Sequence, residues 1–181
     1  MSDPTYLLRS EAESFIDDDF VIDKQTAIFK NSNIRFFNEF KDFTGIKTVP
    51  NYCFDGCRDL LEVTLPSSIT AIKDDAFRST KLTSIVIPEN VKTISQSAFE
   101  SASSITSFTV HTGNPNFGSH GGAIYSDVQC LTLYIIAPGI TEFKVADATT
   151  AVYGDGSNAW QSGRSLKTII LNDKIQGISG V

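Results

Sequence analysis

A short pattern of residues occurs three times in the first half of the chain, and it limits the possible folds more than any other feature. Each copy has an apolar pair, a turn and an aromatic residue. The copies occupy residues 46–54 (IKTVPNYCF), 69–77 (ITAIKDDAF) and 91–99 (VKTISQSAF), so the aromatic residue returns after 23 and then 22 positions. Repeats of this length are typical of solenoids, whose units bury their apolar faces by stacking on one another. We therefore expect an elongated stack with one continuous core.

A strand is expected after each turn, because apolar and polar residues alternate there. The segments are 60–66 (LLEVTLP), 82–88 (LTSIVIP), 105–111 (ITSFTVH) and 166–172 (LKTIILN). Alternation sends one set of side chains into the core and the other set outward, and strands stacked at about 4.8 Å form a parallel ladder. The expected inward pairs are Val63/Leu65, Ile85/Ile87, Phe108/Val110 and Ile169/Leu171.

The regular period is interrupted between Val110 and Leu171, which are 61 residues apart. One more repeat is expected in this interval, with its strand at 142–145 (EFKV), and Ala159-Trp160 supplies the aromatic position of the last turn. A β-hairpin insertion is expected over about 114–138, where two apolar segments flank a Ser-Asp turn. The count is then five repeats.

The first 44 residues carry seven of the thirteen phenylalanines and nine acidic residues against five basic ones. This much aromatic surface is unlike a disordered tail and fits a cap over the open end of a solenoid. Phe36, Phe40 and Phe43 have the spacing of one helix face, and Gly45 is expected to end that helix. Residues 20–29 fit either a strand or an irregular segment.

Length and composition fit one structural domain, which we divide into an N-terminal cap (1–44) and a solenoid (45–181). The net charge of −6 and the lack of a basic cluster argue against a nucleic-acid partner, because neutralising phosphates requires a concentrated basic face. No apolar run approaches the ~18 residues of a membrane span. The start of the chain does not resemble a signal peptide, and a further repeat begins at Ile175, so we expect a piece of a longer protein.

Several short motifs could indicate a metal site, and the sequence favours none of them. Cys53 and Cys57 are four residues apart, but zinc needs four ligands and only the distant His111 and His120 could supply the other two, so thiols of the core or a turn are favoured. Asp17-Asp18-Asp19 and Asp23 lack the glycine and glutamate of an EF-hand loop, which leaves only weak surface binding of calcium open. A disulfide among Cys53, Cys57 and Cys130 is also left open.

Catalytic and cofactor motifs are equally incomplete. Gly154-Asp155-Gly156 lacks the third glycine of a dinucleotide-binding loop and fits a turn. Ser119 and His120 place a nucleophile beside a base, but adjacent residues rarely face each other productively, and residues 119–122 fit a flexible lead into the hairpin. We therefore expect no enzyme activity, no bound cofactor and no metal.

The order of residues within one repeat is itself informative. Ala76-Phe77, Leu82, Ile85 and Ile87-Pro88 resemble the repeat of the BspA-like branch of the leucine-rich repeat proteins, and Phe54-Asp55-Gly56-Cys57 is similar to the Phe-x-x-Cys part of that repeat. The resemblance covers about residues 34–181. The departures from the family pattern are Thr80, Ala102 and Gly163 for Cys, His111 and Asn172 for Pro, Trp160 for Phe, and Thr149 and Val152 for an apolar pair.

This resemblance implies an α/β leucine-rich repeat solenoid that is curved and rich in strands, with short helical turns. It also implies a cell-surface or secreted protein of a bacterium or protist that adheres to proteins of a host or of another cell.

The outward residues of the strands form the candidate binding surface, because extended sheet faces of solenoids are the usual docking surfaces. We expect a non-enzymatic adhesion module whose sheet binds a protein ligand, with the hairpin adding a protruding edge. The alternative is a structural spacer or capping segment of a larger surface protein. The candidate residues are Glu62, Thr64, Ser84, Val86, Ser107, Thr109, Glu142, Lys144, Thr168 and Ile170.

Overall fold

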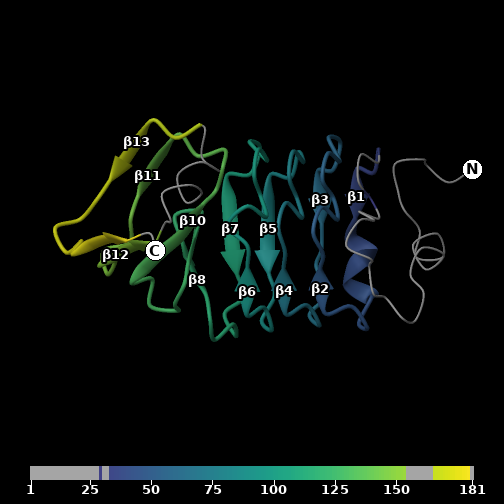
Figure 1. The fold of residues 1–181 in the computed structure, drawn as a ribbon, viewed down its shortest axis with the longest axis horizontal. Helices are drawn as coiled ribbons and strands as arrows, with labels where there is room; N and C mark the ends of the chain where they lie inside the picture. Colours follow the sequence, from purple (N-terminus) through teal and green to yellow (C-terminus); the bar gives the residue numbers. More distant parts are fainter. Residues whose placement is uncertain (1–28, 30–32, 154–164, 180–181) are drawn as a thin grey trace, which may run out of the picture.

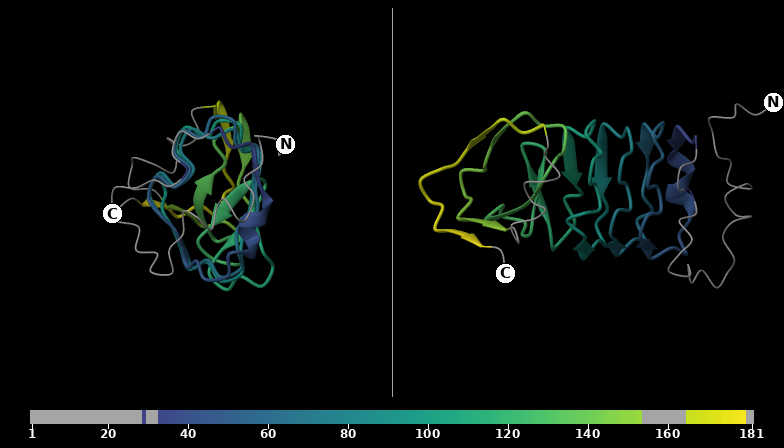
Figure 2. Two further views of the ribbon diagram at one scale, coloured as in Figure 1. Left: turned by 90° about the vertical axis from the view of Figure 1, so that its right-hand side faces the viewer. Right: turned by 45° about the horizontal axis from the view of Figure 1, so that its top comes forward.

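Two parallel ladders of short strands run along an elongated stack (Figure 1). The computed structural model describes residue 29, residues 33–153 and residues 165–179. Viewed along the long axis, the successive repeats follow one another as a closed loop around a shared interior (Figure 2). Parallel pairing between strands about one repeat apart is what a solenoid requires, so the predicted β-rich solenoid is confirmed.

The first ladder consists of the strands that follow the aromatic turns. It is divided into three two-stranded sheets, each with parallel pairing. The expected alternation is present, since Ile85 and Ile87 are buried while Ser84 and Val86 between them are exposed. The strands are β1 (Phe36–Phe37), β3 (Glu62–Val63), β5 (Ser84–Ile87), β7 (Ser107–Val110), β11 (Glu142–Lys144) and β13 (Thr168–Ile170).

The second ladder consists of strands that precede the aromatic turns. One sheet joins β2, β4 and β6, and a later sheet joins β10, β12 and β14. The ladder is therefore interrupted after β6. The strands are β2 (Thr48–Val49), β4 (Ala71–Ile72), β6 (Thr93–Ile94), β10 (Thr132–Ile136), β12 (Ala151–Tyr153) and β14 (Gly177–Ser179).

The interval that predicted a hairpin contains three antiparallel strands instead of two. β8 (Gly118–His120) pairs with β9 (Ala123–Tyr125), and β9 pairs with β10. All three residues of β9 are buried, because apolar side chains point to both of its faces. This segment is part of the core and does not form the protruding edge that we expected.

A column of stacked phenylalanines forms the centre of the core. Phe29, Phe54, Phe77 and Phe99 follow one another with ring centroids 5.1, 5.2 and 5.5 Å apart and with interplanar angles of 10°, 8° and 6°. We call these four rings the aromatic spine. Each ring removes apolar surface from water by covering the next, which one repeat alone could not do.

The turns that carry the spine are held by hydrogen bonds to the following repeat. The Phe54 N–H donates to Ala76 O at 2.8 Å, and the Phe77 N–H donates to Ala98 O at 2.7 Å. In the second ladder the direction is opposite, since the Thr70 N–H donates back to Lys47 O at 2.7 Å. Toward the following repeat, each repeat therefore offers N–H donors in the turn that carries the spine and carbonyl acceptors in the second ladder.

The same turns are not helical, although short helical turns were expected. Gly56, Ser79 and Ser101 occupy equivalent positions and have φ values of 71°, 59° and 58°. A left-handed residue at this point breaks any helix, and the N–H groups bond to the next repeat instead of to the preceding turn. In the described part of the chain, the 3₁₀ helix η1 (Asn38–Asp42) is the one helical element.

The helix predicted from Phe36, Phe40 and Phe43 is wrong in its type and in its first residue. Phe36 belongs to β1 and is half-buried, whereas Phe37, Phe40 and Phe43 are buried. Their spacing of three residues is the period of a 3₁₀ helix, not of an α-helix.

The stack begins upstream of the first repeat that the sequence revealed. Phe29 stacks on Phe54, and β1 pairs in parallel with β3. The division into a cap (1–44) and a solenoid (45–181) stays a prediction, since most of residues 1–32 lie outside the described residues. Asp17-Asp18-Asp19, Gly154-Asp155-Gly156 and Ala159-Trp160 also lie outside them.

The end of the first ladder differs from the prediction as well. Leu171 was expected to point into the core but is 42% exposed, and Ile169 is only partly buried. β13 is the last strand of its sheet among the described residues, so nothing there stacks on its far side. By contrast Val145, Thr149 and Val152 are fully buried, in agreement with the predicted fourth repeat.

Two asparagines follow strands that do not end in proline, Asn172 in the position of the proline itself and Asn114 three residues beyond it. Asn114 Nδ2 donates to Pro88 O at 2.8 Å and to Val91 O at 3.0 Å. Asn172 Nδ2 makes the same pair of bonds to carbonyls 26 and 23 residues upstream. An amide group thus joins the turn of one repeat to the turn before it.

Replacing Phe77 by Ala should destabilise the fold by about 3–5 kcal/mol, because Phe77 is fully buried between two stacked rings and its removal leaves a cavity. Urea denaturation followed by circular dichroism measures this loss. The control Val86→Ala, at a side chain that is 56% exposed, should change stability by less than about 0.5 kcal/mol. A loss below about 1 kcal/mol for Phe77→Ala would contradict the role given to the spine.

Candidate binding face

Six of the ten predicted residues lie together on the outer face of the first ladder. They come from β3, β5 and β7 and their ends, and we call them the N-terminal patch: Glu62, Thr64, Ser84, Val86, Ser107 and Thr109. Ser84 lies opposite Ser107 and Val86 opposite Thr109, so three hydroxyl-bearing side chains and one valine form two rows across β5 and β7. Five of the six are exposed, and Ser107 is partly buried.

Asn38 joins this patch although the sequence did not single it out. Its Nδ2 donates to Glu62 Oε1 at 3.0 Å, and its Oδ1 accepts a hydrogen bond from Thr64 Oγ1 at 3.0 Å. The signal that could have found it is the pairing of β1 with β3, which places the residue after Phe37 beside Thr64. Glu62 and Thr64 are therefore held in fixed orientations by a neighbouring repeat.

The other four predicted residues form a separate C-terminal patch on β11 and β13. Glu142 lies opposite Thr168, and Lys144 lies opposite Ile170. Lys144 Nζ is 3.5 Å from an Asp147 carboxylate oxygen, but both side chains are well exposed, so this ion pair contributes little.

A glycine turn separates the two patches, so the ten residues do not form one face. Gly121 and Gly122 join β8 to β9 and have φ values of 60° and 85°. A Cβ on Gly122 would lie 2.7 Å from Thr106 O and 2.8 Å from Ile140 Cδ1, and a Cβ on Gly121 would touch the Phe143 ring at 3.4 Å. The turn therefore occupies the space between β7 and β11, where a further ladder strand would otherwise lie.

Ser119 and His120 also differ from the prediction of a flexible lead. They belong to β8, and Ser119 Oγ accepts a hydrogen bond from the Val110 N–H at 3.0 Å. The serine thus has a structural partner, and His120 is exposed beside the turn.

The cysteines are all free thiols. Cys57 Sγ donates to Phe29 O at 2.7 Å, which ties the first ring of the spine to the next repeat. Burial raises the pKa of the Cys53 thiol far above its usual range, and the nearby Cys57 adds to the effect. Across residues 29, 33–153 and 165–179, no group of three or more His, Cys, Asp or Glu side chains is arranged to hold a metal ion.

One charged cluster lies on the turns that carry the spine. The nearly buried Asp55 carboxylate accepts hydrogen bonds from Arg78 Nε at 2.9 Å and from Arg78 Nη2 at 3.3 Å. Asp75 is less well satisfied, because its Oδ1 is buried without a hydrogen bond and Arg78 Nη1 is 3.9 Å from its other oxygen. Burial therefore raises the pKa of Asp75, against the lowering effect of Arg78.

A profile described as the BspA type leucine rich repeat region matches residues 24–146 in six copies, which is more than half of the chain. The chain belongs to the BspA-type leucine-rich repeat family. The match begins upstream of the first repeat predicted from the sequence, in agreement with the position of Phe29 and β1 in the stack. Among curated proteins no sequence match was found.

Three solved structures share the BspA-type solenoid at low identity. A leucine rich cell surface protein from Faecalibacterium prausnitzii A2-165 is 24% identical, with a TM-score of 0.59 over 80% of this chain and 37% of its own. The pneumococcal vaccine antigen PcpA is 20% identical, with a TM-score of 0.61 over 81% of this chain and 36% of its own. A leucine-rich repeat protein from Bacteroides ovatus ATCC 8483 is 18% identical, with a TM-score of 0.51 over 83% and 35%.

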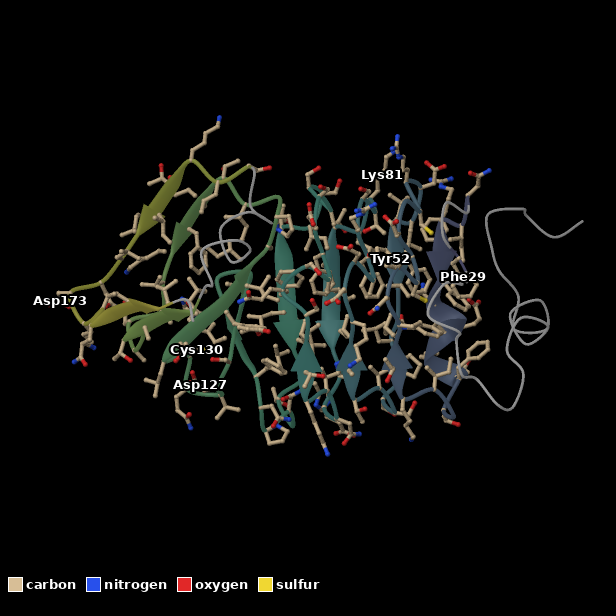
Figure 3. All side chains as sticks on the ribbon, in the orientation of Figure 1. Phe29, Tyr52, Lys81, Asp127, Cys130 and Asp173 are labelled. Carbon is tan, nitrogen blue, oxygen red and sulfur yellow. The ribbon has the colours of Figure 1, made fainter. Side chains whose placement is uncertain are left out.

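These similarities show the fold, and the chain spans just over a third of the length of each of the three structures. In the described ranges of this BspA-type chain, no helix has the length and apolar character needed to cross a membrane. Figure 3 shows the two ends of the stack, with Phe29 at the N-terminal end and Asp173 at the C-terminal end.

Replacing Asp75 by Asn should stabilise the fold at pH 7, because it removes a poorly solvated charge and because Asn tolerates the left-handed φ of 54° found there. The folded pKa of Asp75 is raised, so its charge opposes folding above that pKa. The gain in Tm should shrink as the pH falls and vanish below the unfolded pKa of about 3.9.

Thermal denaturation of both proteins between pH 3 and pH 7 measures this difference. The neighbouring Asp74→Asn is the control, since Asp74 is exposed and its replacement should leave Tm unchanged. A Tm gain for Asp75→Asn that stays constant over the pH range would contradict the explanation by charge burial.

Proposed function

We propose that this chain is a protein-binding module of a cell-surface or secreted protein, and that its partner docks on the N-terminal patch. The observation that carries the proposal is the arrangement of outward side chains on the paired strands β5 and β7, where Ser84 lies opposite Ser107 and Val86, 56% exposed, lies opposite Thr109. The backbone beneath them is already hydrogen-bonded within the ladder, so binding would not have to order it.

The chemistry of the patch suits a protein partner. Serine and threonine hydroxyls both donate and accept hydrogen bonds, and Val86 offers apolar surface among them. Only Glu62 carries a charge, and Asn38 already holds it in place. Such a face would bind by shape and hydrogen bonding, which suits the polar contacts of a non-obligate interface.

Surface adhesion, rather than catalysis, is the activity we propose for the module. The one titratable side chain of the N-terminal patch is Glu62, which is exposed on the outer face of the ladder and hydrogen-bonded to the neutral amide of Asn38, so we assign it no acid or base role. The cell-surface description of the similar protein from Faecalibacterium prausnitzii is consistent with this proposal.

A second function, that of a rigid spacer, is favoured by the bonding between repeats. Hydrogen bonds run in opposite directions on two walls, and a continuous spine lies between them. Such a stack would hold another part of a longer protein at a fixed distance without binding a partner itself.

Lysine at Ser84, Ser107 and Thr109 should abolish binding to a partner while the fold is retained, because three new charges would lie at the centre of the interface. The probe is an array of purified extracellular-matrix and cell-surface proteins, read by surface plasmon resonance. A matched control places lysine at Ser67, Ser103 and Thr112, which are exposed but lie outside the patch. Docking on the patch would be contradicted if both triple variants lost affinity equally, or if the variant at Ser84, Ser107 and Thr109 still bound. The spacer function would then remain as the proposed function.

A further inference from the structure

A groove opens beside β6, where the second ladder is interrupted. Its volume is about 660 Å³, and it lies between the edge of β6 and the turn 126–129, with Phe117 and Tyr134 among its lining residues. A smaller hollow of about 220 Å³ adjoins it and shares Lys92, Pro115 and Asn116 with it. The N-terminal patch belongs to the first ladder, so the groove is a different surface.

The interruption leaves one backbone carbonyl without its usual donor. In the two earlier repeats, Lys47 O accepts from the Thr70 N–H at 2.7 Å, and Thr70 O accepts from the Lys92 N–H at 2.8 Å. The equivalent acceptor in the third repeat is Lys92 O, and the residue in the donor position is Pro115, which has no N–H. Among the described residues, none donates a hydrogen bond to Lys92 O.

The next carbonyl along the same edge, Ile94 O, already accepts a hydrogen bond. Ile72 O accepts from the Ser95 N–H at 2.8 Å, whereas Ile94 O accepts from the Tyr134 hydroxyl at 2.6 Å. The Tyr134 hydroxyl thus replaces the missing ladder strand as the donor to Ile94 O, and Lys92 O is left without a donor. Sheet edges with open backbone groups are places where an extended chain can add as a further strand.

The side chains around this carbonyl define what could bind. Lys92 lines both the groove and the hollow, and no carboxylate of the described residues lies within 4 Å of its ammonium group. Glu89, which lines the hollow but not the groove, lies 4.0 Å from His111 Nδ1. Asp127, on the other side, uses both oxygens to accept the Leu131 and Thr132 N–H groups. Val128 beside it is 47% exposed and adds apolar surface.

We propose that an extended segment of a partner protein lies in this groove along β6. One backbone N–H of the segment donates to Lys92 O, which Pro115 leaves without a ladder donor. An acidic side chain of the segment pairs with the Lys92 ammonium, and an apolar side chain contacts Val128. The volume lies in the range of roughly 300–1,000 Å³ that is typical of pockets for drug-sized ligands, so the groove would hold only a few residues of the segment.

The probe for this proposal is a library of twelve-residue peptides displayed on phage and selected against the whole chain. An enriched peptide, made synthetically, is then titrated into the ¹⁵N-labelled chain. The amide signals of Thr93, Ile94 and residues 126–129 should shift. Failure to enrich any peptide, or shifts confined to β3, β5 and β7, would overturn the proposal.

Two substitutions distinguish a local effect at the groove from a general effect of changing the charge of the protein. Lys92→Glu should weaken the peptide about tenfold or more, through loss of one ion pair and new repulsion. Lys47→Glu is the matched control, because Lys47 holds the same place in the repeat but its carbonyl is already bonded to Thr70. An equal effect of both substitutions would overturn the proposed ion pair.

The backbone bond is tested with the peptide itself. N-methylation of one backbone amide at a time removes its N–H, and one position should abolish binding while the neighbouring positions tolerate the change. If every position tolerates N-methylation, the segment does not pair with Lys92 O and the proposal is wrong.

Discussion

The stacking of each repeat on the next is the interaction on which the rest of this structure depends. No single repeat contains a core of its own, since the ring of Phe54 is covered on one side by Phe29 and on the other by Phe77. Hydrogen bonds accompany this stacking. The N–H groups of the turns that carry the spine donate to the next repeat, and the N–H groups of the second ladder donate to the previous repeat. A repeat is therefore fixed in position by both neighbours, and the backbone positions of its outward side chains are fixed with it.

The regular stacking ends where Pro115 takes the place of a ladder donor. From that point the chain leaves β6 and forms β8 and β9, and the Gly121–Gly122 turn enters the space between β7 and β11. Two consequences follow from this one event. The outward face is divided into an N-terminal and a C-terminal patch, and the edge of β6 borders a groove.

The sequence predicted what depends on local period, and it missed what depends on contacts between distant repeats. The strands and their inward residues followed from alternation, because a period of two fixes the face of each side chain. The contribution of Asn38 could not be predicted, since it requires the pairing of β1 with β3 across 26 residues. The exposure of Leu171 also escaped prediction, because burial at the end of a stack depends on what lies beyond it and not on the local pattern.

The aromatic positions show the same limit. Phe36 and Phe37 are adjacent in β1, and the pairing of Phe37 with the buried Val63 of β3 places Phe37 in the core. The family resemblance implied short helical turns, but left-handed residues such as Ser79 direct the N–H groups to the next repeat.

The repeats should form one cooperative stack held by these bonds between neighbours, and native-state hydrogen exchange of single amides measures this cooperativity. The Phe54 and Phe77 amides, in the turns that carry the spine, and the Thr70 and Lys92 amides, in the second ladder, should exchange with one common free energy of opening, close to that of global unfolding. Rapid exchange at Phe54 and Phe77, with protection only in the ladder, would contradict it.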